Sequence, residues 1–412
     1  MPQADLLLQS PRIITCAPGL APRPGRAMEE LGIVENGALA VQAGRVVAVG
    51  PRREVLADWQ GPVVEHSGCL TPGLVDPHSH PLFGGSRVHE FELRARGATY
   101  QEIHAAGGGI ASTVEATRAA SDEELRQTTL SRLQRMLRHG TTTAEVKTGY
   151  GLSTAEELRH LKVYDELRQH TPQRLVLTFM GAHALPPEFA GRQSEFVDLL
   201  VEEMIPAVAA QGLAEYGDVF CEQGAFTQDE SRRVLGACRD AGLKLRIHAE
   251  EFTYQGGARM AAELGAASAD HLQFLPPEDF EVLRQAGTIP VMTAGTSFFL
   301  GMSQFAPARG LIEADLPLAL GSDFNAGSCL SESMQMALSL GVLKLGLTPA
   351  QALIGATVNS AHSLGRGQQV GSLEVGKWAD VLALDVLDIR EWPYHYGVNL
   401  VQAVYLGGLR VV

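Results

Sequence analysis

Leu74-Val75-Asp76-Pro77-His78-Ser79-His80 is the stretch that decides the fold, an apolar run that ends in two histidines. Leu74 and Val75 suit a buried strand, and side chains along a strand alternate between its two faces. His78 and His80 therefore share one face, where two imidazoles can converge on a metal ion if the strand ends at the mouth of a barrel. Alone, the pair is weak evidence, because packed or solvated histidines give the same pattern.

Further residues of metal-ligand type close later apolar runs. His248 lies near the end of KLRIHAE, His271 near the end of ASADHL, and Asp323 near the end of LALGSDF. The carboxyl ends of barrel strands meet at one face, so we expect these side chains to meet the two earlier histidines there. Imidazoles with one carboxylate suit Zn²⁺ or Fe²⁺ better than Ca²⁺ or Mg²⁺. The recurrence favours a metal site over structural histidines.

The same runs belong to a series of alternating strands and helices. Eight runs of strand character lie between residues 74 and 324. Helical segments are expected between them at 121–139, 154–170, 194–211, 228–242, 254–264 and 277–286. This order predicts an α/β protein with a (β/α)8 TIM-like barrel, a fold of about 250 residues.

Both ends of the chain follow a different pattern, with short β-rich runs separated by turn residues. One hairpin is expected at 38–49, with its turn near Ala43-Gly44. We therefore predict a small composite β-sandwich domain, built from residues 1–68 and 366–412, beside a barrel domain of residues 69–365.

The glycine-rich stretch and the search for nucleophile motifs give no support to a nucleotide-binding or nucleophilic mechanism. Gly107-Gly108-Gly109 lacks the flanking residues of a phosphate loop and is interpreted as an active-site loop. No G-x-S-x-G elbow or paired Cys/His signature points to nucleophilic serine or cysteine catalysis.

The amino-acid composition limits the classes of partner that the protein is expected to bind. The 412 residues carry 33 Lys and Arg against 47 Asp and Glu, a formal charge of −14, which disfavours nucleic acid and anionic lipid. No apolar run approaches the about 18 residues of a membrane span. The scattered cysteines predict reduced thiols, so we expect a cytoplasmic protein that acts on a small molecule. These cysteines are Cys16, Cys69, Cys221, Cys238 and Cys329.

Five separated blocks carry a family resemblance: HPLFGGSR at 80–87, EVKTGYG at 145–151, GAH at 181–183, HAEE at 248–251 and GSDFNAGS at 321–328. Together with VDPHSH and the closing GSLEVGKWADVLALD, they resemble the amidohydrolase superfamily and, within it, the imidazolonepropionase family. The resemblance covers essentially the whole chain.

The resemblance implies a metal centre of defined composition. It implies one ion, Zn or Fe, held by His78, His80, His248 and Asp323. Lys147 would then be a charged residue behind the ligands. Binuclear members of the superfamily carry a carboxylated lysine that bridges two metals, so a modified Lys147 stays an alternative.

The resemblance also implies the reaction, the hydrolysis of 4-imidazolone-5-propanoate to N-formimidoyl-L-glutamate in histidine degradation, by a homodimer. Asp323 would take a proton from water, and Glu251 or His271 would be the second acid/base group. The expected substrate contacts are Arg87 for the propanoate, Tyr150 and His183 for the ring, and Glu251, Asn325, Gly327 and Ser328 beside them.

Two other functions stay open. A mononuclear amidohydrolase or deaminase of another nitrogen heterocycle would share the metal ligands but would not need Arg87 with Tyr150 and His183. A catalytically silent binding protein of the same fold is the non-enzyme alternative, and it would be expected to lose at least one ligand.

Overall fold

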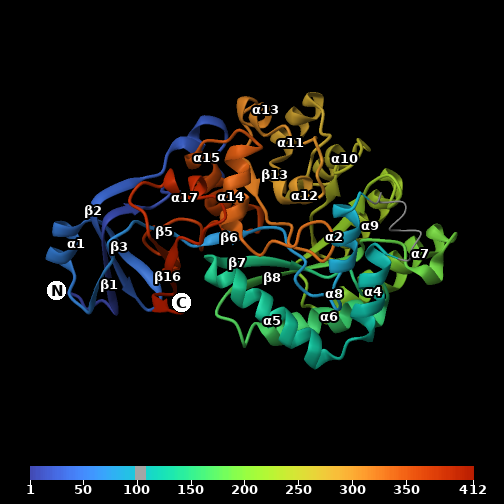
Figure 1. Ribbon diagram of the computed structural model, residues 1–412, viewed down its shortest axis with the longest axis horizontal. Coiled ribbons are helices and arrows are strands. Elements are labelled where there is room, and N and C mark those ends of the chain that lie inside the picture. Colours follow the sequence, from blue (N-terminus) through green and yellow to red (C-terminus); the bar gives the residue numbers. More distant parts are fainter. Residues whose placement is uncertain (98–107) are drawn as a thin grey trace.

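The structure is a computed structural model that describes residues 1–97 and 108–412, so Gly107 of the predicted loop lies outside the described residues. A sheet built from both chain ends lies beside a larger barrel ringed by helices, and the N- and C-termini are both in the terminal sheet (Figure 1).

The barrel follows the predicted runs, and each strand pairs in parallel with the next one along the chain. The fifth strand position is split into two short pieces, β10 and β11, around Arg246 and Ile247. The strands are β6 (Leu74–Asp76), β7 (Thr141–Lys147), β8 (Arg174–Ala182), β9 (Tyr216–Cys221), β10 (Lys244–Leu245), β11 (His248–Ala249), β12 (Ser268–His271), β13 (Ile289–Met292) and β14 (Ala319–Leu320).

The barrel closes between β14 and β6, just beyond the ends of both strands. The Asp323 N–H donates to the His78 carbonyl at 2.9 Å, and the His80 N–H donates to the Phe324 carbonyl at 2.7 Å. The backbone N–H of Ser322 donates to Asp76 Oδ1 at 3.0 Å. The predicted parallel α/β barrel is confirmed, and its seam runs through the ligand-bearing segments.

Helices begin where the sequence offers a cap. Ser121, Ser153 and Thr227 each accept a hydrogen bond from the backbone N–H three residues later. The helices around the barrel are α5 (Asp122–Arg138), α6 (Thr154–Leu167), α9 (Gln228–Asp240), α10 (Gly257–Glu263), η4 (Pro277–Asp279), α11 (Phe280–Ala286), α13 (Ala308–Glu313), α14 (Met334–Leu343), α15 (Pro349–Ile354), η5 (Gly355–Asn359) and α16 (Ser360–Ser363).

Two predicted helices differ in detail. The expected helix at 194–211 is α7 (Gln193–Leu199) and α8 (Ile205–Gln211), joined by a π-helical turn, η3 (Leu200–Met204), just before Pro206. Proline has no N–H to donate to the preceding turn, so the hydrogen-bond register widens there. The expected helix at 254–264 begins only at Gly257.

Four further helices belong to loops that follow barrel strands. They are α2 (Val88–Ala95), α4 (Ile110–Ala119), η2 (Pro187–Phe189) and α12 (Ala294–Phe299). Gly109, the last residue of the predicted glycine loop, lies at the N-terminus of α4 with φ +88°, a conformation that glycine adopts without strain.

The terminal sheet is mixed and draws strands from both chain ends. Its central strand β1 pairs with β2 along one edge and with β4 and β5 along the other, and the β2–β3 hairpin turns at Ala43-Gly44 as predicted. The elements of this part of the chain are β1 (Leu6–Ile14), η1 (Gly25–Glu29), β2 (Ile33–Gln42), β3 (Arg45–Pro51), α1 (Arg52–Asp58), β4 (Val63–Glu65), β5 (Leu70–Pro72), β15 (Val381–Leu384), α17 (Glu391–Tyr394), β16 (Val401–Leu406) and β17 (Leu409–Arg410). The domain boundaries at 68–69 and 365–366 stay a proposal.

All five cysteines are buried with free thiols, as predicted. Among the helices of the described chain, none combines the length and the apolar character needed to cross a membrane.

Candidate active site

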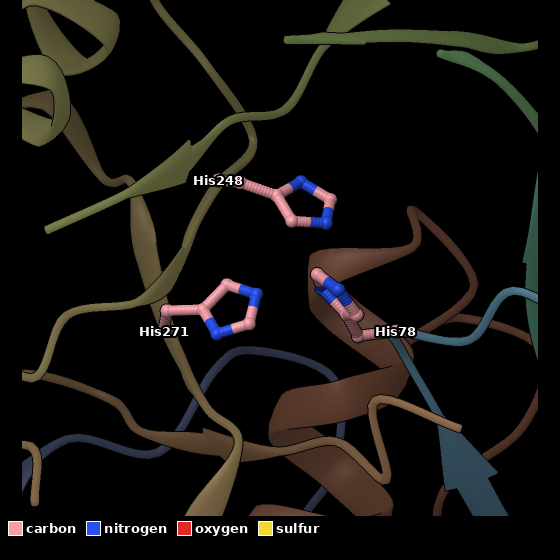
Figure 2. Close-up of side chains that lie close together, drawn as sticks. All are labelled: His78, His248 and His271. Carbon is pink, nitrogen blue, oxygen red and sulfur yellow. The ribbon is translucent and has the colours of Figure 1, made fainter. Parts of the chain in front are cut away.

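The barrel mouth gathers the ligand-type residues that the sequence places at strand ends. The rings of His78, His248 and His271 face one another across a small space (Figure 2). His78 also belongs to a second group of closely spaced donor atoms, together with His80 and Asp323. All five side chains are buried.

The spacing of these atoms fits a metal ion. His78 Nε2 lies 3.4 Å from His80 Nε2 and 3.3 Å from Asp323 Oδ1, and His80 Nε2 lies 3.2 Å from His248 Nε2. Ligands about 2.0–2.2 Å from a tetrahedral ion lie about 3.3–3.6 Å from one another. These three separations are close to the tetrahedral spacing, His80 Nε2 lies somewhat farther from Asp323 Oδ1, at 3.8 Å, and His271 is a further donor beside His78 and His248.

Two carboxylates behind the histidines fix their orientation. Asp270 Oδ2 lies 2.6 Å from His78 Nδ1, and Asp218 Oδ1 lies 3.1 Å from His248 Nδ1. A carboxylate that accepts the Nδ1–H leaves the Nε2 lone pair free for a metal ion. The Nε2 atoms of both rings consequently face the shared space.

A buried ionic network lies beneath this layer. Lys147 Nζ is 2.8 Å from Glu145 Oε2 and 2.7 Å from Asp218 Oδ2. Arg246 pairs with Glu145 at 2.9 Å and with Asp270 at 3.2 Å. Each of these buried charges has an opposite charge beside it, as burial in a low-dielectric core requires.

Sequence reasoning identified only Lys147 in this network and missed the other four members. Glu145, Asp218 and Asp270 lie within the buried strands β7, β9 and β12, and Arg246 lies in the short break between β10 and β11. A charged residue within a buried strand is rarely fully buried without a partner, and this signal could have found them.

Electrostatics keep the imidazoles neutral. Burial lowers the pKa of His78, His80 and His271 well below the ordinary histidine value, and neighbouring positive groups add to the effect. Burial likewise lowers the pKa of His183 to about 3. A neutral imidazole offers a lone pair, so the site suits a cation.

The acid/base candidates stand together beside the ligands. Glu251 Oε2 lies 3.7 Å from His271 Nδ1, and Thr293 Oγ1 lies 2.9 Å from the same nitrogen. Burial raises the pKa of Glu251 well above the ordinary glutamate value, and the negative charge of Asp323 raises it further. Burial also raises the pKa of Asp323 to about 6.

The backbone adopts uncommon conformations at two of these residues. His271 has φ +78° and Asp323 has φ +49°, in the left-handed region that non-glycine residues seldom occupy. His271 is the last residue of β12, and Asp323 lies three residues beyond β14. Such strain persists only where the surroundings hold it in place.

Aromatic residues form one wall of the mouth. His183 stacks on His80 with ring centroids 5.2 Å apart, and the Tyr150 ring lies 5.3 Å from that of His183. The buried Glu157 of α6 accepts hydrogen bonds at 2.9 Å from the N–H groups of Gly151 and Leu152, which fixes the loop that carries Tyr150. The structure thus brings Tyr150 and His183 to the predicted place.

Arg87 is not free in this structure. Its Nη2 lies 2.7 Å from Glu90 Oε2, within the first turn of α2, and its guanidinium lies against Gly327. The Glu90 carboxylate also accepts the Gly109 N–H at 2.9 Å. A substrate carboxylate would share or exchange this partner.

The 325–328 turn is organised by its own asparagine. Asn325 Oδ1 accepts the N–H groups of Gly327 and Ser328 at 2.8 Å, and its Nδ2 donates to the Asp323 carbonyl at 2.7 Å. Asn325 therefore shapes the turn after Asp323, and its amide is already occupied by these contacts.

Comparison with known proteins agrees with this geometry. A model of the amidohydrolase family matches residues 69–408. The imidazolonepropionase of Symbiobacterium thermophilum is 47% identical over 413 residues, which cover 99% of this chain and 97% of that protein. The imidazolonepropionase of Geobacillus kaustophilus is 46% identical over 398 residues, 95% of this chain and 94% of that protein.

Solved structures share the fold at low identity. An adenosine deaminase from Xanthomonas campestris with bound zinc has a TM-score of 0.72 at 20% identity and covers 99% of this chain and 93% of its own. A zinc-complexed atrazine chlorohydrolase from Arthrobacter aurescens has a TM-score of 0.73 at 18% identity, covering 99% and 95%.

The chain therefore belongs to the amidohydrolase family. Family and donor geometry together define a metal-binding centre in a hydrolase of carbon–nitrogen bonds. Its full-length curated relatives reported above are imidazolonepropionases, as the sequence motifs indicated.

Proposed function

We infer that this protein hydrolyses the cyclic amide of 4-imidazolone-5-propanoate to N-formimidoyl-L-glutamate, a step of histidine degradation. The observation that carries the inference is the gathering of four buried imidazoles and one carboxylate at the barrel mouth, in a chain 47% identical to an imidazolonepropionase over 99% of its length.

We propose that His78, His80, His248 and Asp323 hold one ion, Zn or Fe. When bound, such an ion supplies Lewis-acid chemistry that makes water nucleophilic near neutral pH. Four separations among these donor atoms, of 3.2 to 3.8 Å, support this set, and the ion pairs of Lys147 with Glu145 and Asp218 support a single centre with an unmodified lysine.

In the proposed reaction, Asp323 accepts the proton that water loses as it attacks the amide carbonyl. The ring C–N bond then breaks, and the leaving nitrogen takes a proton from Glu251 or His271. The proximity of these two side chains, 3.7 Å between Glu251 Oε2 and His271 Nδ1, supports a shared role in that transfer.

The residues that line the barrel mouth supply the proposed contacts with the substrate. Arg87 offers a planar fork that suits the propanoate, once Glu90 shares or releases it. Tyr150 and His183 supply the surface for the ring, and Glu251 lies within reach of its nitrogen atoms. We further propose that the turn with Asn325, Gly327 and Ser328 contacts the amide and carboxylate ends through its backbone and the Ser328 hydroxyl.

We also propose that the enzyme is a cytoplasmic homodimer. Its net charge of −14 argues against nucleic acid as a partner.

A turnover screen tests the function. Metal-loaded protein should open imidazolonepropanoate, with product followed by chromatography, and should leave hydantoins and aminated purines intact. Turnover of an aminated purine in preference to imidazolonepropanoate would identify a deaminase instead.

A further inference from the structure

The two oxygens of the Asp323 carboxylate face different surroundings. Oδ1 points at the histidines, 3.3 Å from His78 Nε2 and 3.8 Å from His80 Nε2. Oδ2 accepts a hydrogen bond from the hydroxyl of Thr296, a buried residue of α12. One oxygen therefore faces the metal centre, and the other is held by a neutral donor.

The fold brings Thr296 to this carboxylate by a close approach. A Cβ atom at Gly295 would lie 2.8 Å from Cys329 Sγ and 3.3 Å from the Ser322 carbonyl, so only glycine lets α12 come this near. Asp323 is fixed from the other side, because its N–H donates to the His78 carbonyl at 2.9 Å. Donor and acceptor are both anchored, which favours a permanent contact.

A second threonine makes a parallel contact one helical turn earlier. Thr293 Oγ1 lies 2.9 Å from His271 Nδ1. The segment 293–296, which follows β13, therefore reaches both Asp323 and His271 with hydroxyl groups.

We propose that Thr296 is a positioning residue for hydrolysis, whose hydroxyl orients Asp323 so that Oδ1 faces the histidines and Oδ2 receives the proton from water. A carboxylate oxygen has two acceptor sites, so the Thr296 hydrogen bond occupies one and leaves the other open. This role rests on the proposed function.

The alternative is that the hydrogen bond of the Thr296 hydroxyl only stabilises the core and has no role in the reaction. Thr296→Val keeps the shape and removes the donor, whereas Thr296→Ser keeps the donor, so the two variants separate these roles. Thr129→Val is the matched control, since the buried Thr129 hydroxyl of α5 has no hydrogen-bond partner within the described chain. Thr296→Ala serves as a second donor-free variant if the valine does not fold.

We expect kcat of Thr296→Val on imidazolonepropanoate to fall about 10- to 100-fold, because a hydrogen bond to a charged group in the chemical step is lost. KM should stay within about twofold, because the Thr296 hydroxyl contacts Oδ2 of Asp323, and the assay contains excess metal so that weaker binding of the ion does not lower its occupancy. Thr296→Ser should recover most of the rate, and Thr129→Val should match the wild type.

Three outcomes would overturn the proposal. They are an unchanged kcat in Thr296→Val, an equal loss in the serine and valine variants, and a loss in the valine variant that excess metal fully restores. A crystal structure of Thr296→Val needs no substrate, and an Asp323 carboxylate that keeps its orientation there would also refute the role. A wild-type enzyme that fails to open imidazolonepropanoate would instead refute the proposed function.

Discussion

Asp270→Asn tests whether the carboxylate behind His78 sets the affinity of the metal centre. Asp270 Oδ2 lies 2.6 Å from His78 Nδ1, and Oδ1 accepts the Ser268 hydroxyl at 2.6 Å. Arg246 approaches Oδ2 at 3.2 Å, and Lys147 approaches it at 3.7 Å. The substitution keeps the shape of the side chain and removes its charge.

The surroundings decide how the new amide turns. The cations of Arg246 and Lys147 favour the amide oxygen at the Oδ2 position, and the Ser268 oxygen can accept from the amide nitrogen at the other. The Nδ1–H of His78 therefore keeps an acceptor, and His78 Nε2 stays available to the ion. The loss is that of the charge on the acceptor.

Second-sphere changes of this kind cost about 10- to 100-fold in metal affinity. Since the tautomer is retained, we expect the lower end, about tenfold, which corresponds to about 1.4 kcal/mol. An amide that turned its nitrogen to His78 would expel the ligand and give the larger loss.

The assay is competition for Zn²⁺ against a chelator of known affinity, with circular dichroism to confirm the fold. Asp279→Asn is the matched control, because Asp279 is a buried carboxylate paired with Arg259 and Tyr254, outside the metal site. Equal zinc affinity in wild type and Asp270→Asn, with both folded, would refute the reasoning. An equal loss in Asp279→Asn would show a general effect of buried charge.

Further predictions follow from the same site. Elemental analysis should find one Zn or Fe per chain, and two ions with a carboxylated Lys147 would contradict the single centre. Removing the ion should lower the thermal midpoint of unfolding, since a ligand at about 1,000 times its Kd stabilises the folded state by about 4 kcal/mol. Arg87→Lys should lower kcat/KM about 10- to 100-fold, because the planar fork is lost, and an unchanged value would move the carboxylate site elsewhere. Glu251→Gln should cost about 100- to 10,000-fold in kcat with metal retained if Glu251 is the main acid/base group; a larger loss in His271→Asn would assign that role to the histidine.

Local patterns in the sequence predicted most of the fold. Alternating apolar runs marked the barrel strands, and capping residues such as Ser121 marked helix starts. The helix expected from residue 254 failed at its beginning, because the Glu250 carboxylate accepts the N–H groups of Gly257 and Ala258 and holds the preceding residues out of the helix. This contact depends on where the strand that precedes Glu250 ends, and the local periodicity of the sequence does not reveal that position.

Some features of the site could likewise be predicted from the sequence, and others could not. Strand ends brought His78, His248 and Asp323 together as predicted, because barrel topology alone determines where strand ends meet. The pairing of His78 with Asp270 joins residues 192 apart in sequence, so it emerges only from the closed barrel. The ion pair between Arg87 and Glu90 could have been predicted from the sequence, since residues three apart on a helix are neighbours.

The seam of the barrel makes the metal centre a reporter of folding. Asp76 and Ser322, which share a hydrogen bond across it, are 246 residues apart in sequence, so the barrel closes only after the whole eight-strand course has formed. His78 and Asp323 belong to opposite sides of that seam, so an ion held by both, as proposed, would link the first strand to the last. We therefore expect high affinity for the ion only from the closed barrel, and we expect an opened or incomplete chain to release it.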